Sequence, residues 1–129
     1  VTPKDYLRLK NNYHRLVENL PVSRVLFVGN TEVGRLVENS GLGSRAEFIS
    51  EDRILPFEAV HDVMKEVLDS ILEGQELPRG ITGWYYQQFL KMQYTYQCED
   101  PYYMIWDGDT ISADRFLCSM RKAAYPTLI

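Results

Sequence analysis

Apolar residues along the chain follow two spacings, one typical of amphipathic helices and one typical of buried strands. The first spacing predicts a helix that Asp5 caps and that ends before Pro21. Its apolar residues recur every three or four positions: Tyr6, Leu9, Tyr13, Leu16, Val17 and Leu20. The second spacing predicts strands at 24–28, 46–50 and 102–106, each a short run rich in apolar side chains.

The run at 102–106, Tyr-Tyr-Met-Ile-Trp, has five consecutive large side chains, so we expect it to form a central strand. Further helices are predicted at 31–40, at 56–74 and at 84–97. Thr31 is the expected N-cap of the first of these. Because the 84–97 helix is apolar on most sides, we expect it to be sandwiched between other elements.

This alternation of strands and helices predicts one α/β domain over residues 1–129, a three-layer fold with a mostly parallel sheet. The end of the chain is less regular, and we expect a helix at 115–124. The length of 129 residues, with 45% apolar and 25% charged residues, is typical of a single folded domain.

Composition and charge exclude several classes of protein. The net charge of −4 argues against a nucleic-acid binder, and no apolar run is long enough for an integral membrane segment. The stretch 51–76 is strongly acidic, which is typical of a solvated helix face. Cys98 and Cys118 are too few for a disulfide scaffold, so we expect free thiols and a cytoplasmic location.

Four polar segments follow predicted strands or precede predicted helices: 2–5, 29–30, 51–52 and 107–109. Ligands of open parallel sheets bind at the carboxyl ends of the strands, where such segments gather. The most informative is Asp-Gly-Asp at 107–109. Two carboxylates after a buried strand are expected to need a counter-charge, and hard oxygen ligands of this kind suit Mg²⁺ or Mn²⁺ shared with a substrate diphosphate.

Other polar side chains near these ends are candidates for ligand binding. Lys4 could contact a phosphate, and Asn30 or Asp52 could contact a base or ribose from the strand ends. The segment 29–34, Gly-Asn-Thr-Glu-Val-Gly, follows a strand and opens a helix. It lacks the Lys-Ser/Thr pair of a P-loop and the middle glycine of a dinucleotide-binding loop, so we reject both.

The 84–97 helix carries Gln87 and Gln88 among apolar neighbours. If the helix is buried, one amide is expected to bond the 107–109 loop or a ligand. Lys91 could neutralise the aspartate pair or a phosphate. His14 and His61 are expected to be exposed, and neither is paired with a serine or cysteine that would indicate a catalytic triad.

These features together resemble a known family. The strand followed by Asp-x-Asp-Thr, with the upstream helix Gly-Trp-Tyr-Tyr-Gln-Gln-Phe-Leu-Lys-Met, resembles glycosyltransferases of the GT-A fold, closest to a bacterial group of uncharacterised glycosyltransferase-like proteins. The start, Val-Thr-Pro-Lys-Asp, is similar to the end of that family's first strand and its nucleotide-contacting loop, which would involve Thr2, Pro3 and Lys4. The resemblance implies that Asp107 and Asp109 bind a divalent metal and the diphosphate of a nucleotide-sugar.

Such a protein would transfer a sugar from a nucleotide-sugar donor to a glycan or other acceptor. Family members are usually longer, because an acceptor-binding half follows the Asp-x-Asp, whereas 20 residues follow Asp109 here. We therefore expect the donor-binding part of a larger glycosyltransferase.

Two other functions remain open. One is a non-catalytic α/β binding module. The other is a phosphotransferase of the haloacid-dehalogenase type, which also uses Asp-x-Asp after a strand. That class has Thr or Val two residues after the second aspartate, where Ile111 stands here, and places the motif near the N-terminus.

Overall fold

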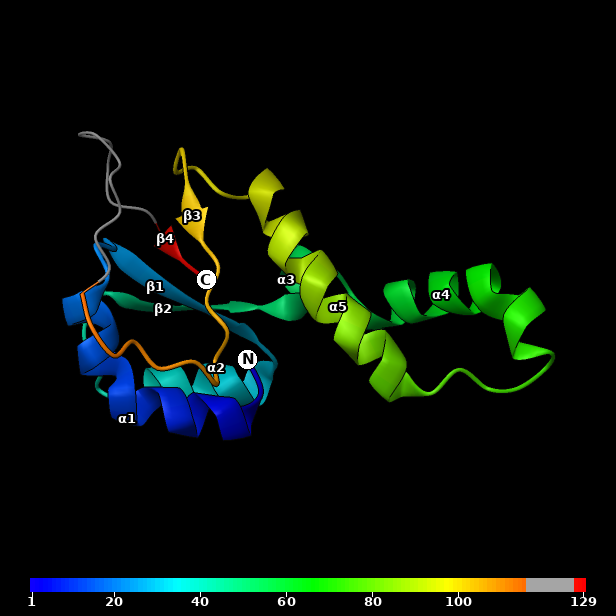
Figure 1. Cartoon of the computed structure of the whole chain (residues 1–129), viewed down its shortest axis with the longest axis horizontal. Coiled ribbons are helices and arrows are strands. Elements are labelled where there is room, and N and C mark those ends of the chain that lie inside the picture. The colour runs from blue at the N-terminus through cyan, green and yellow to red at the C-terminus, as the bar shows by residue number, and fades with distance from the viewer. Residues whose placement is uncertain (116–126) are drawn as a thin grey trace. The chain divides into compact units, whose positions relative to one another are not determined.

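The computed structural model describes residues 1–115 and 127–129. The chain divides into two compact units (Figure 1). Unit 1 comprises Val1–Ser50 and Cys98–Ile129, and unit 2 comprises Glu51–Gln97. The helix expected at 115–124 lies almost wholly outside the described residues. Among the residues that are described, no helix has the length and apolar character needed to cross a membrane.

Unit 1 contains a four-stranded sheet in the order β2-β1-β4-β3. The strands are β1 (Arg24–Gly29), β2 (Ala46–Ser50), β3 (Tyr103–Met104) and β4 (Thr127–Leu128). All three pairings are parallel. The fold class is therefore confirmed: the protein has an α/β fold with an all-parallel sheet flanked by helices.

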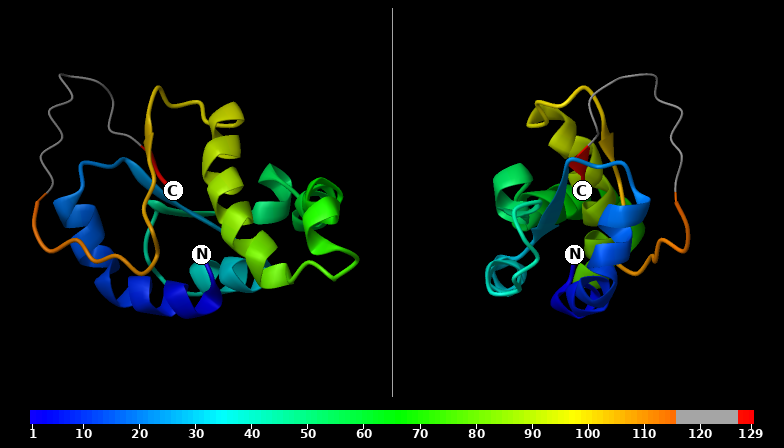
Figure 2. Two further views of the ribbon diagram at one scale, coloured as in Figure 1. Left: turned by 45° about the vertical axis from the view of Figure 1, so that its right-hand side comes forward. Right: turned by 90° about the vertical axis from the view of Figure 1, so that its left-hand side faces the viewer.

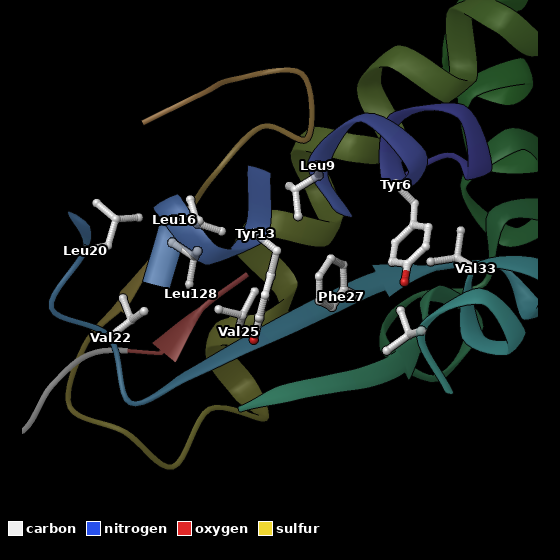
Figure 3. Close-up of a cluster of buried hydrophobic side chains, with 11 residues drawn as sticks. Tyr6, Leu9, Tyr13, Leu16, Leu20, Val22, Val25, Phe27, Val33 and Leu128 are labelled. Carbon is white, nitrogen blue, oxygen red and sulfur yellow. The ribbon is translucent and has the colours of Figure 1, made fainter. Parts of the chain in front are cut away.

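The core of unit 1 lies between the sheet and two helices, α1 (Pro3–Asn19) and α2 (Thr31–Glu38). Figure 3 shows Tyr6 and Tyr13 of α1 directed toward β1. The rings of Tyr6 and Phe27 meet edge to face, with centroids 5.5 Å apart. Phe48 of β2 lies opposite Phe27 in register, and its ring is in contact with Gly34 of α2. Both helices therefore cover the same face of the sheet.

Each helix of unit 1 is capped by a residue slightly earlier in the chain than the one predicted. Thr2 rather than Asp5 caps α1, because the Thr2 hydroxyl accepts a hydrogen bond from the Asp5 N–H at 3.2 Å. Asn30 rather than Thr31 caps α2, because its side-chain oxygen accepts from the Val33 N–H at 3.1 Å. Both caps have extended backbone and a short polar side chain, which satisfies a helical N–H without an internal partner.

The prediction of a central strand at 102–106 is wrong. Only Tyr103–Met104 form a strand, and among the described strands it lies at the edge of the sheet. The place beside β1 is taken by β4, whose Leu128 is almost fully buried. Tyr102 and Ile105 are exposed, so the apolar run is not buried along its whole length. A run of large side chains does not reveal a competing strand more than 20 residues further along the chain.

Unit 2 is helical, as both views in Figure 2 show. It contains α3 (Glu51–Ile54), α4 (Phe57–Leu72), α5 (Arg79–Gln93) and the 3₁₀ helix η1 (Tyr94–Tyr96). Its second long helix begins five residues earlier than predicted, after Pro78. It is not sandwiched on all sides, because only Thr82, Tyr86 and Leu90 of α5 are buried.

The expectation for the two histidines holds for one and fails for the other. His14 is exposed on α1, as predicted. His61 of α4 is only 4% exposed, and its Nδ1 lies 2.7 Å from the Thr82 hydroxyl of α5. The charged neighbours of His61 along the chain suggested a solvated position, but the ring stacks on Phe57 and packs against α5.

Candidate functional site

The candidate site lies in unit 1, where the carboxyl ends of β1 and β3 meet the start of α1. In a parallel sheet, ligands bind at the carboxyl ends of the strands, because the N-termini of the helices also point toward that side. Three of the polar segments predicted from the sequence lie there: the residues around Thr2, the Gly29-Asn30 pair and the Asp107–Asp109 turn.

The Asp107–Asp109 turn is closed by two hydrogen bonds. The Thr110 N–H donates to the Asp107 carbonyl oxygen at 2.9 Å, and the Trp106 indole N–H donates to the Thr110 carbonyl oxygen at 3.1 Å. Asp107 and Asp109 are both exposed. Water can therefore solvate both carboxylates, and the expected counter-charge beside the pair stays a prediction.

Gly108 brings this turn against the beginning of α1. A Cβ atom at Gly108 would lie 3.3 Å from the Asp5 Cβ and 3.7 Å from the nearest side-chain carbon of Val1. Asp5 was predicted as a helix cap within the 2–5 segment, and its Cβ lies beside the Asp107–Asp109 turn. No local pattern indicates this contact, because the spacing of Thr2 and Asp5 indicates only the start of a helix.

The residues around Thr2 are helical rather than part of a loop. Pro3 and Lys4 lie in the first turn of α1, and Lys4 is exposed. The Thr2 hydroxyl donates to the Asp5 carboxylate at 2.6 Å while it accepts from the Asp5 N–H. Its main role in this structure is thus to hold the helix start, and a ligand would have to compete with that arrangement.

The end of β1 is in close contact with the start of the chain. A Cβ at Gly29 would approach the Val1 carbonyl oxygen to 2.7 Å, so only glycine fits there without a shift. Because Val1 also contacts Gly108, it links the end of β1 to the Asp107–Asp109 turn. Asn30 is exposed, and its side-chain oxygen is used in capping α2.

The remaining candidates belong to unit 2. Asp52 is exposed in α3, Gln87 is exposed on α5, and Gln88 and Lys91 are half-buried on α5. The argument that a buried amide needs a partner therefore does not apply to Gln87. A hydrogen bond from either amide to the Asp107–Asp109 turn stays a prediction.

A buried tyrosine of the same unit, Tyr86, is close enough to Asp52 for the Asp52 charge to affect its hydroxyl. The Tyr86 hydroxyl donates to the Leu55 carbonyl oxygen at 2.6 Å. Burial raises the pKa of Tyr86, and the neighbouring carboxylates of Glu51 and Asp52 raise it further. Burial also raises the pKa of the Glu51 carboxyl. Tyr86 therefore serves as a neutral donor that ties α5 to the end of α3.

At the amino ends of β1 and β4, four polar side chains form a network that the sequence did not indicate: Arg24, Asp100, Thr127 and Glu47, whose carboxylate lies 3.5 Å from the Arg24 guanidinium. The Arg24 side chain donates to the Thr127 hydroxyl at 2.8 Å and to the Asp100 carboxylate at 3.1 Å. The Thr127 hydroxyl also donates to Asp100, and these bonds lower the pKa of the Asp100 carboxyl. Since β1 and β4 both start here, the network fixes their pairing rather than a ligand.

The donor atoms at the candidate site fit a divalent cation only under one condition. Among residues 1–115 and 127–129, no group of three His, Cys, Asp or Glu side chains is placed to hold a metal ion. Mg²⁺, however, is commonly bound by one or two carboxylates together with substrate phosphates. Asp107 and Asp109 fit that requirement, so a cation would be held jointly with a bound diphosphate.

Comparison with known proteins gives the family. The model of a family described as "Family of unknown function (DUF6492)" matches residues 28–120, so the chain belongs to this family. The match includes the Asp107–Asp109 turn and excludes α1. No curated protein matches the chain. No solved structure matches it either.

Proposed function

We propose that the chain is the donor-binding part of a metal-dependent glycosyltransferase, which transfers a sugar from a nucleotide-sugar to a glycan or other acceptor. The observation that carries the proposal is the position of the Asp107–Asp109 turn. It follows a strand of a parallel sheet and contacts the start of α1 through Gly108. An exposed carboxylate pair beside a helix N-terminus suits a cation and a phosphate group at once.

In this proposal each group has a distinct role. Asp107 and Asp109 would hold Mn²⁺ or Mg²⁺, and Lys4 would contribute positive charge toward a phosphate. The ion would supply electrostatic stabilisation of the diphosphate leaving group. The N-terminal N–H groups of α1 and α2 point toward the same edge of the sheet and favour an anion there.

Calorimetry with UDP and with other nucleoside diphosphates, in Mn²⁺ and in EDTA, tests the proposal. We expect binding that depends on Mn²⁺ and that Asp109→Asn abolishes, because a lost carboxylate weakens the attraction for the ion. Asp114→Asn is the matched control, since Asp114 is also exposed in unit 1 and its carboxylate accepts a bond from the Arg115 N–H. Equal binding in EDTA would contradict the proposal.

Each of the other two functions predicts a different result. Hydrolysis of a phosphate monoester that requires Asp107 would favour the phosphotransferase. No binding of any nucleotide, with or without metal, would favour a non-catalytic module.

A further inference from the structure

Strand β2 lies at one edge of the sheet in unit 1, and among the described strands only β1 pairs with it. The carbonyl oxygen of Arg45, one residue before β2, accepts a hydrogen bond from the Val25 N–H of β1 at 2.7 Å. In a parallel ladder, alternate residues direct both backbone groups toward the neighbouring strand, and the residues between them direct theirs away. The N–H and C=O groups of Phe48 and Ser50 therefore point away from β1.

The outer side of β2, called here the β2 edge, has space beside it and a sequence suited to pairing. A cavity of about 280 Å³ adjoins Ala46 and Phe48 and is otherwise lined by residues of α2 and of the 41–43 loop. The sequence of β2, Ala-Glu-Phe-Ile-Ser, includes an aromatic and a β-branched residue and contains neither proline nor glycine. An edge of this kind is a template for a further strand.

We infer that the β2 edge pairs, antiparallel, with the β2 edge of a second copy of this chain, about a two-fold axis at Phe48. In an antiparallel ladder, two opposite residues whose backbone groups face each other exchange both N–H···O bonds. Phe48 has this orientation, so it can lie on the axis and bond the Phe48 of the other copy. The Ser50 N–H can then donate to the Ala46 carbonyl oxygen opposite it, while the Ala46 N–H already donates to the Gly43 carbonyl oxygen at 3.2 Å.

The charges in and beside β2 favour this register over the two nearest alternatives. With the axis at Phe48, Arg45 of each copy stands opposite Glu51 of the other, so opposite charges meet at both ends of the ladder. An axis at Ile49 would set Glu47 opposite Glu51. An axis at Glu47 would set the two Glu47 carboxylates against each other. Like charges directly opposite destabilise a strand pair, so the register with Phe48 on the axis is preferred.

The side chains of β2 are compatible with the same register on both faces of the sheet. Glu47, the single charged residue of β2, projects from the face opposite to Phe48 and stands opposite Ile49 of the second copy. Its carboxylate lies 3.5 Å from the Arg24 guanidinium of its own chain, which offsets its charge. On the other face the two Phe48 rings stand directly opposite each other, and such aromatic pairs stabilise antiparallel strands.

Sedimentation velocity of the whole chain, from about 5 to about 300 µM, tests the pairing. A ladder of this length is a small interface, so we expect a dimer with a Kd on the order of tens of micromolar. Arg45→Glu should raise the Kd at least about tenfold, because like charges then meet at both ends. Glu51→Lys should do the same. An equimolar mixture of the two variants should associate, because each Glu then stands opposite Lys or Arg.

Hydrogen exchange of the wild-type chain tests the register without any variant. At high concentration the amides of Phe48 and Ser50 should exchange at least about tenfold more slowly than in dilute protein, because they gain an acceptor. The amides of Glu47 and Ile49, which already face β1, should change less. Equal slowing at all four amides would contradict the pairing, since the alternation follows from the direction of the backbone groups.

The matched control is Arg15→Glu, the same change of charge at an exposed position of α1. It should leave the Kd unchanged, and far-UV circular dichroism checks that each variant is folded. A wild-type chain that stays monomeric at the highest concentration overturns the inference. A dimer that folded Arg45→Glu retains with an unchanged Kd also overturns it, because the contact must then lie elsewhere.

Discussion

The two units differ in how their apolar side chains are used. In unit 1 they meet from both sides of an interface between sheet and helices, and Tyr6, Phe27 and Leu128 are almost completely buried. In unit 2 only Val60 and His61 of the 16-residue helix α4 are buried. Val67 and Ile71, on the apolar side of the same helix, are 70% and 74% exposed.

This difference shows what hydrophobic periodicity can and cannot predict. Periodicity identifies the apolar side of a helix, because side chains three and four residues apart share a face. It does not show whether another element covers that side. In unit 1 a sheet provides the covering surface, whereas the described residues of unit 2 form helices alone.

Unit 2 is instead joined by a small cluster of aromatic and polar contacts between α4 and α5. The Phe57 ring stacks on His61 at 5.9 Å and meets Tyr86 edge to face at 5.1 Å. The Arg79 guanidinium lies 4.6 Å above the Phe57 ring. Side chains with specific geometry therefore take the place of a large core in this unit.

The largest expected effect comes from removing a core ring of unit 1. Phe27→Ala should lower the free energy of unfolding by about 3–5 kcal/mol, because it opens a cavity between α1 and the sheet. Phe89→Ala, which removes the same atoms from a half-exposed position of α5, should cost less than about 1 kcal/mol when the chain is monomeric. Urea unfolding of dilute protein measures both. Equal losses would show that the two units do not differ in this way.

A pair of glycine variants compares helix packing in the two units. Gly34 of α2 and Gly83 of α5 are both helical, so alanine gains about the same helix propensity at each, up to 1 kcal/mol. At Gly34 the new Cβ would lie 2.6 Å from the Phe48 ring, while at Gly83 it meets nothing within 4 Å. We expect Gly34→Ala to be less stable than Gly83→Ala by about 1–3 kcal/mol, from overpacking. Thermal unfolding of both variants decides; equal shifts would mean that Phe48 can move aside.

Elements that depend on residues close together in the sequence were predictable, whereas elements that depend on distant residues were not. The strands at 24–28 and 46–50 and the helix after Pro3 depend on local patterns, and their existence was predicted. The position of β4 was not, since it depends on pairing between Val25 and Leu128 across the length of the chain. A parallel pairing of two residues leaves almost no local signal.

The candidate site was predictable in part. The convergence of the Thr2, Asn30 and Asp107 segments follows from the parallel topology, which sequence alternation indicates. The solvent exposure of the two aspartates does not follow from it, because it depends on β3 being short and lying at the edge. The participation of Asp5 depends on the contact with Gly108, which no local pattern predicts.

A smaller effect is expected from the buried hydrogen bond of unit 2. Thr82→Val leaves the His61 Nδ1 without its partner inside the protein and should lower the stability of this unit by about 1–3 kcal/mol. Thr82→Ser keeps the hydroxyl and should therefore retain most of the stability of this unit. Hydrogen exchange of amides in α4 and α5 measures the change, and the amides of β1 serve as the internal reference. A loss of protection that is equal in β1 would show that the units unfold together.

The smallest expected effects come from two carboxylates that arginines hold, one in each unit. Hydrogen bonds from Thr127 and Arg24 lower the pKa of Asp100, and hydrogen bonds from Arg79, at 2.6 and 3.1 Å, lower the pKa of Glu58. A carboxyl with a lowered native pKa stabilises the fold above its unfolded pKa of about 4, and this contribution is lost as the pH falls through the native value.

Both units should therefore lose some stability between about pH 5 and pH 2, by a small amount because both carboxylates are solvated. Carboxyl resonances followed by NMR should titrate below the ordinary range for both residues. Asp100→Asn should reduce the acid sensitivity of amide protection in β1, and Glu58→Gln that in α4. Because Thr127 is fully buried beside Asp100 while the Glu58–Arg79 pair is exposed, we expect the Asp100 variant to have the larger effect. If Glu58→Gln had the larger effect, the Asp100 network would contribute less to unit 1 than the Glu58–Arg79 pair contributes to unit 2.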